Sequence, residues 1–186
     1  MRYNSKRWIA FLILLLVAPA ISLKAQDDST TVTKDQIQHM QDSVFAIINQ
    51  NYQAVRPIFE HSCFNCHSKF TDYPWYHKLP LVKSLIDSDI KEARHHVDMS
   101  DDFPFGGEHV PLVTLRHIKR EIEEADMPPW DYRLMHWGTK IEGEKQDSVF
   151  QWIDTSEKTL TDFYEAAGIP LPKTPASEQM EEDEEE

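Results

Sequence analysis

Apolar side chains recur every three or four residues along most of the chain after residue 33, with polar residues between them. This spacing places the apolar residues on one face of a helix. The regular alternation of a β-strand is absent, and the chain has only 5 glycines. The pattern predicts a mainly α-helical domain, with helices over residues 33–49, 52–67, 81–96, 112–125 and 144–167.

Capping residues set the outer limits of this helical region. Thr33 and Gln36 have the spacing of a capping box before the first helix. Gly168 stands where a glycine commonly follows the last residue of a helix. Between these limits, Pro57 is expected to kink the second helix or to mark its first turn, because proline lacks the N–H that an interior helical position donates.

Prolines also delimit the segments between helices. Pro128 and Pro129 cannot continue the fourth helix, so Met127 lies at a forced break. The prolines at positions 74 and 80 argue against a helix over residues 71–80. Residues 132–138 are expected to form a turn.

The two ends of the chain differ in composition from the helical region. Residues 1–25 combine basic residues, an apolar run and small residues, which is typical of an export signal. An uncleaved N-terminal anchor is the alternative, although the apolar run is short for a full membrane span. The pattern then predicts a polar linker over 26–32, one domain over 33–169, and a disordered acidic tail over 170–186.

The stretch Cys63-Phe64-Asn65-Cys66-His67 carries the most specific chemistry. Two thiols three residues apart, followed at once by an imidazole, form the attachment pattern of c-type haem. One helical turn carries both sulfurs to the vinyl edge of a porphyrin, and His67 then serves as the proximal iron ligand. Val55, Ile58 and Phe59 are expected to pack beside the ring. Because the chain has only 2 cysteines, the motif predicts one covalent haem c per chain.

Two other kinds of site use a Cys-x-x-Cys pair. A thioredoxin-type redox pair requires a strand that leads into a helix, and no strand-like run precedes Cys63. A zinc site would have to recruit scattered histidines, because there is no second cysteine pair. Both alternatives stay open at this point.

Three further residues are candidates for contact with the haem. Met127 is a candidate distal ligand, because a thioether sulfur opposite a histidine nitrogen is the usual axial pair of electron-transfer cytochromes c. The indole N–H of Trp75 is suited to a haem propionate, and so is the planar guanidinium of Arg94. On composition alone, other side chains compete with Met127 for the iron. They are several histidines and three methionines, Met40, Met99 and Met135.

The net charge of −13 bears on partners and location. It argues against nucleic acid and against an anionic membrane surface, so the only predicted link to a membrane is an uncleaved N-terminal segment. An acidic electron carrier is expected to meet redox proteins with basic surfaces. Haem is ligated to thiols outside the bacterial cytoplasm, so the motif and the export signal agree on a periplasmic location.

The chain resembles a small bacterial haem-binding domain family related to c-type cytochromes. The resemblance covers about residues 47–153. In that family a CxxCHS motif is followed by a YPWY-like segment, and here Cys63–Ser68 precede Thr71–Tyr76. Two departures are Ala93, where the family tends to have glycine, and Asp98-Met99-Ser100 in place of Asn-Phe-Ser. The later blocks follow in the family's order, at Pro80, Arg94, Met127-Pro128, Met135-His136 and Trp152.

The resemblance implies a small cytochrome c-like helical domain wrapped around one haem. It also implies that Met127 is the distal ligand, because the family places a Met-Pro pair there. Electron transfer without substrate chemistry is then the expected function. Two alternatives are a peroxidase-like haem oxidoreductase, with His95, His96 or Arg94 as an acid–base group, and a haem-based sensor module.

Overall fold

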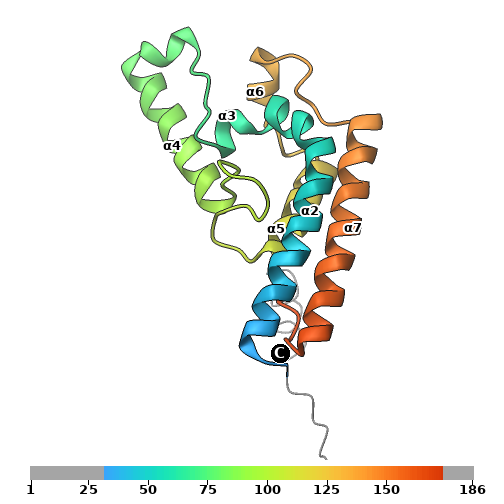
Figure 1. The fold of residues 1–186 in the computed structure, drawn as a ribbon. Coiled ribbons are helices and arrows are strands. Elements are labelled where there is room, and N and C mark those ends of the chain that lie inside the picture. The colour runs from blue at the N-terminus through green and yellow to red at the C-terminus, as the bar shows by residue number, and fades with distance from the viewer. Residues whose placement is uncertain (1–31, 174–186) are drawn as a thin grey trace, which may run out of the picture. The chain divides into compact units, whose positions relative to one another are not determined.

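The computed structural model of the protein describes residues 32–173. The mainly α-helical prediction is confirmed within these residues (Figure 1). No helix among them is long and apolar enough to cross a membrane. The predicted export signal and most of the predicted acidic tail lie outside the described residues. The helices are α2 (Lys34–Ser62), α3 (Phe64–His67), η1 (Trp75–Lys78), α4 (Pro80–His96), α5 (Pro111–Glu123), α6 (Trp130–Met135) and α7 (Glu144–Ala167).

Helix α2 is one continuous helix where the sequence predicted two. Its capping box is confirmed, because Thr33 Oγ1 accepts from the Gln36 N–H at 3.3 Å and Gln36 Oε1 accepts from the Thr33 N–H at 2.9 Å. Pro57 lies inside the helix. The carbonyl that Pro57 leaves without its usual donor belongs to Gln53, an exposed residue within reach of water. The buried residues on either side, Tyr52 and Phe59, hold this part of α2 in the core.

The core lies between α2, α5 and α7. In Figure 1 α2 and α7 lie side by side, and α5 packs against α7. Four aromatic rings fill the centre, with neighbouring centroids 5.2–6.3 Å apart: Tyr52, Phe59, Phe105 and Trp152. Val55 belongs to the same core. Phe59 packs against Phe105 and Trp152, and none of Val55, Ile58 and Phe59 lines the cavity beside α4, so the predicted packing of these three residues beside a haem is not supported.

Three local predictions also differ from the structure. Helix α5 ends at Glu123, a few residues before the prolines, and Ala125 adopts a left-handed conformation with φ 60°. Residues 130–135, partly predicted as a turn, form helix α6, which begins directly after Pro129. The segment over 71–80 contains the 3₁₀ helix η1, whose first hydrogen bond runs from the His77 N–H to the Pro74 carbonyl at 3.0 Å.

Helix α4 has the predicted amphipathic pattern, but only two short helices of the described residues pack against it. Pro80 occupies its first turn, where the missing N–H costs nothing. Within the described part of the chain, α4 packs only against α3 and η1 among the helices, and Ile90 is its one buried residue. An apolar helical face normally requires a second layer. The missing layer on this face defines the site.

Candidate haem site

A cavity of about 820 Å³ lies beside α4. Its walls come from α3, α4, α5 and α6 and from the loops that join them, and most of their surface is apolar. This volume falls within the range of about 300–1,000 Å³ that is typical of small-molecule and cofactor sites. The face of α4 that lacks a protein partner supplies one wall, through Leu85, Ile86, Ile90 and Ala93.

The cysteine motif forms the junction between α2 and α3 and lines this cavity. Cys63, Cys66 and His67 all face it, and the His67 N–H donates to the Cys63 carbonyl at 2.9 Å to close the turn. Burial raises the pKa of the Cys63 thiol to about 12 and also raises that of Cys66. Both thiols are therefore protonated at neutral pH, unlike the thiolate of a thioredoxin-type redox pair.

The His67 ring is oriented by the strand-like segment that follows α4. Its Nδ1–H donates to the Val97 carbonyl at 2.9 Å, which leaves the lone pair of Nε2 available. Burial lowers the pKa of His67, so the ring is neutral at pH 7. A neutral imidazole whose second nitrogen is held by a carbonyl is the usual arrangement of a metal-binding histidine.

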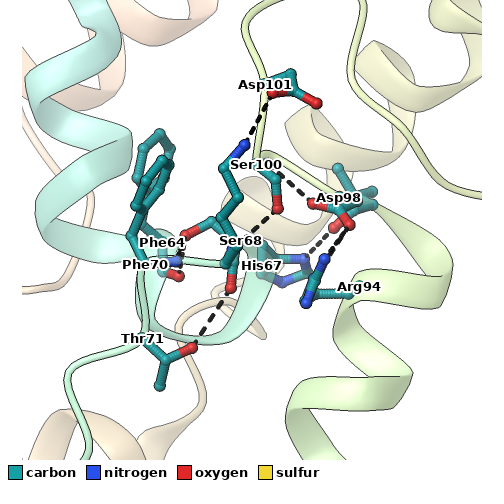
Figure 2. Close-up of polar contacts among 11 residues, drawn as sticks. Phe64, His67, Ser68, Phe70, Thr71, Arg94, Asp98, Ser100 and Asp101 are labelled. Atoms are coloured by element: carbon teal, nitrogen blue, oxygen red, sulfur yellow. Dashed lines mark hydrogen bonds and ion pairs between the residues drawn. The ribbon is translucent and has the colours of Figure 1, made fainter.

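Residues 98–101 clamp the motif from the other side (Figure 2). The Met99 N–H donates to the His67 carbonyl at 2.6 Å, and Ser100 Oγ accepts from the Lys69 N–H at 2.9 Å. Asp98 Oδ1 in turn accepts from the Ser100 N–H at 2.8 Å. These bonds tie α3 to the end of α4 and so fix the position of His67 in the cavity wall.

Asn65, between the two cysteines, has a positioning role that the sequence did not reveal. Its Nδ2 donates to Tyr132 Oη on α6 at 2.8 Å, and its Oδ1 accepts from the Asp72 N–H at 3.0 Å. The Tyr132 ring stacks on His136 with centroids 4.0 Å apart. Asn65 therefore joins the motif to α6. The x positions of CxxCH vary freely in chemical type, so the motif alone carried no signal for this contact.

The structure brings four of the six predicted site residues to one cavity: Cys63, Cys66, His67 and Met127. Met127 follows the end of α5 and is 39% exposed. Among the competing methionines, Met99 and Met135 also line the cavity, and Met99 lies beside His67 through its backbone bond. Met40 lies elsewhere, in a shallow pocket near Phe163.

Trp75 and Arg94 lie outside the cavity lining. Trp75, on η1, is 78% exposed. Arg94 is engaged by Asp98, whose Oδ2 accepts from Nε at 3.0 Å and from Nη2 at 2.7 Å, as Figure 2 shows. The same bonds, together with those from Ser100, hold the pKa of Asp98 below its usual value against the opposing effect of burial. Contacts of Trp75 and Arg94 with a cofactor stay predictions.

Gly107→Ala is expected to weaken the support of His67. Gly107 has φ 121°, and a Cβ there would lie 2.3 Å from the His96 carbonyl oxygen, next to Val97. Backbone strain and this clash together predict a loss of about 2–4 kcal/mol in the free energy of unfolding by urea. Gly168→Ala is the control, because Gly168 has φ 66° but open space around its Cβ, and it should lose only about 1 kcal/mol. If both variants lose the same free energy of unfolding, the close contact between residue 107 and the His96 carbonyl does not contribute to stability.

Comparison with known families identifies the kind of domain. Residues 20–155, which include α2 to α6 and part of α7, match the family described as haem-binding domain. The chain belongs to this haem-binding domain family. The match includes the cysteine motif and every wall of the cavity, so the family assignment and the geometry concern the same site.

One curated relative bears on the chemistry of this haem-binding domain. The chain is 26% identical over 114 residues to the cytochrome c peroxidase Ccp of Escherichia coli strain K12. The match covers 57% of this chain and 23% of that protein, so the chain spans about a quarter of the relative's length. No solved structure matches the chain significantly.

The residues around the cavity fit a haem. Apolar walls suit the porphyrin faces, two thiols and a neutral imidazole stand together at one side, and Met127 offers a thioether sulfur. One more observation points to an absent partner. His117 lines the cavity, and its Nε2 is buried without a hydrogen-bond partner among the described residues. An orphaned buried nitrogen is costly unless a ligand or water satisfies it.

Proposed function

We propose that this haem-binding domain is an exported c-type cytochrome that holds one covalent haem and transfers single electrons between redox proteins. The observation that supports it best is the convergence of Cys63, Cys66, His67 and Met127 on a single apolar cavity. Two cysteines in the whole chain suffice for one attachment site.

Each motif residue has a distinct task in this proposal. The protonated thiols of Cys63 and Cys66 become thioethers by addition of S–H across two vinyl groups, so that neither bond needs an oxidant. His67 binds through Nε2, while its bond to Val97 keeps the ring from rotating. Bound haem supplies the Fe(III)/Fe(II) couple. The apolar face of α4 excludes water from it, and low polarity around a haem is one determinant of its potential.

The decisive experiment is to express the full chain, with its N-terminal segment, in bacteria that carry the haem-ligation machinery. The proposal predicts a coloured product whose intact mass exceeds that of the bare chain by one haem, with a c-type pyridine haemochrome spectrum. Recovery of the same product from the periplasmic fraction would support export. A colourless protein at the mass of the bare chain would overturn the proposal, and zinc in place of iron would favour a structural metal site.

Met127→Ala is expected to remove the distal ligand. Loss of a thioether ligand abolishes the far-red sulfur-to-iron band of the ferric protein and lowers the reduction potential, because methionine stabilises the ferrous state. Met135→Ala is the matched control, since Met135 also lines the cavity. The measurement is the absorption spectrum together with a redox titration. If Met135→Ala removes the band and Met127→Ala does not, Met135 is the ligand.

Partners with basic surfaces follow from the charge of −13. Encounter between an acidic carrier and a basic partner is accelerated by their fields and slows as salt screens them. The electron-transfer proposal therefore includes an association rate that falls as ionic strength rises. Nucleic acid is not expected as a partner of so acidic a chain.

A peroxidase-like haem oxidoreductase is the second candidate, and the similarity to a cytochrome c peroxidase is the observation that favours it. The matched part is under a quarter of that protein. Peroxide turnover with a high-spin ferric spectrum would support an open distal site. A low-spin spectrum without turnover would support electron transfer, and binding of carbon monoxide without turnover would indicate a sensor.

A further inference from the structure

We propose that the haem propionates are bound at the end of the cavity formed by His96, His109, His117 and Arg120, with Arg120 as their main cationic anchor. This inference rests on the proposed haem c. It assigns a carboxylate-binding role to residues that the sequence did not connect with the propionates, and Arg120 takes the role that the sequence predicted for Arg94.

The cysteine edge of the cavity is unsuited to propionates. In haem the two vinyl groups and the two propionates occupy opposite edges, so thioethers at Cys63 and Cys66 direct the propionates away from α3. Asp89 and Asp131 line the cavity near this edge. Burial is the main cause that raises the pKa of Cys66, and the negative charges of Asp89 and Asp131 raise it further. Both carboxylates therefore lie near Cys66. Two propionates there would add to this negative charge. Glu108 and Glu121 also line the cavity at the proposed end, but they lie beside His96, His109 and Arg120.

The basic side chains of the lining lie elsewhere. Arg120 is the single arginine or lysine among the described residues that line the cavity. It lies one turn after His117 on α5. Burial is the main cause that lowers the pKa of His117, followed by the charge of His109 and then by that of Arg120. The His117 ring packs edge-on against His109 with centroids 4.6 Å apart.

Glu108 joins the remaining histidines to this group. Its carboxylate contacts His96 Nδ1 directly and lies 3.5 Å from His109 Nε2. These contacts hold the pKa of Glu108 below its usual value, with the hydrogen bond to His96 as the main cause. Glu108 thus keeps two cavity-lining imidazoles in place at this end of the cavity.

Arg120 can donate hydrogen bonds to a further carboxylate. Its Nη2 lies 3.1 Å from Oε1 of the adjacent Glu121, and its side chain is 46% exposed. Exposed pairs of this kind contribute little, about 0–1 kcal/mol. The planar guanidinium retains donors for a bidentate bond to a carboxylate. Arg94, in contrast, already donates from both Nε and Nη2 to Asp98.

Arg120→Gln in the exported holoprotein tests the inference, with Arg116→Gln as the matched control. Arg116 lies one turn earlier on α5 and pairs with Glu157, outside the cavity lining. With haem attached, Arg120→Gln is expected to lower the reduction potential, because an unneutralised propionate favours ferric iron, and to shift the propionate-bending bands in the resonance Raman spectrum. Arg116→Gln should change neither. Equal behaviour of the two variants would overturn the inference.

A second measurement covers the case in which Arg120→Gln fails to mature. The full chain with Cys63→Ala and Cys66→Ala is titrated with haemin and with haemin dimethyl ester, which lacks the carboxylates. Arg120 should make haemin bind at least about tenfold more tightly than the ester. Arg120→Gln should reduce this ratio and Arg116→Gln should not; an unchanged ratio would refute the site. Failure of the proposed function is distinct, because the wild-type chain would then carry no haem at all.

Discussion

Replacing Cys63 and Cys66 together with alanine is expected to abolish covalent attachment of haem. Both sulfurs line the cavity and both are protonated thiols in a chain that has only 2 cysteines. The variant keeps His67 and the apolar walls, so any haem that remains is held without thioether bonds. Intact mass under denaturing conditions should fall to that of the bare chain, and haem staining of a denaturing gel should be lost entirely.

His61→Ala is the matched control for this loss. His61 precedes the motif by two positions, is exposed and lies outside the cavity lining. Its variant should retain the full haem mass and the haemochrome spectrum of the wild type. The single variants Cys63→Ala and Cys66→Ala should each keep one thioether, with the haemochrome band shifted toward that of protohaem. Haem that stays bound to the double variant under denaturing conditions would contradict the attachment site.

The helical pattern and the cysteine motif could be predicted because their signals are local. The capping box at Thr33 and the glycine at 168 act within one turn of a helix, and the structure has both as expected. The order Cys63, Cys66, His67 is likewise a property of one helical turn. The apolar face of α4 was also visible in the sequence. Hydrophobic periodicity cannot say what covers such a face, and here it lines the cavity.

Predictions failed where distant contacts overrule local preference. A break was expected at residues 50–51, and Pro57 was expected to kink the second helix or to mark its first turn, but α2 runs through both positions. Packing of Tyr52 and Phe59 against Trp152 keeps α2 continuous. Tertiary packing commonly overrides propensity in this way. The same packing moved Phe59 from the expected haem contact into the core. Trp75 drew attention as an aromatic close to the motif, yet η1 exposes it to solvent.

The polar part of the site was hidden from the sequence for a related reason. The bond from Asn65 to Tyr132 spans 67 positions, and the clamp from Lys69 to Ser100 spans 31. His117 and Arg120 belong to a helix whose apolar stripe was recognised, but their neighbours His96 and Glu108 come from the end of another helix and a loop. Only the fold shows that these groups share one end of the cavity.

Removal of haem is expected to loosen α4 far more than the rest of the described domain. In the Cys63→Ala, Cys66→Ala chain purified without haem, the lining residues of α4 face an empty cavity. Helix α4 contacts only α3 and η1 among the described helices, and an apolar face without a partner contributes little to holding a helix. Amides of α4 should exchange with deuterium at least about tenfold faster than in the holoprotein, because local opening then costs less free energy.

Helix α7 provides the internal reference in the same sample. It packs against α2 and α5, and Val149, Ile153 and Leu160 are almost completely buried without any help from the cavity. Exchange of its amides should therefore change little when haem is removed. Haemin binds only the form in which α4 is folded against the cavity, and binding therefore stabilises that form. The amides of α4 should exchange slowly again when haemin is added. Equal changes in α4 and α7 would show that haem stabilises the domain as a whole and would refute a local role for this face.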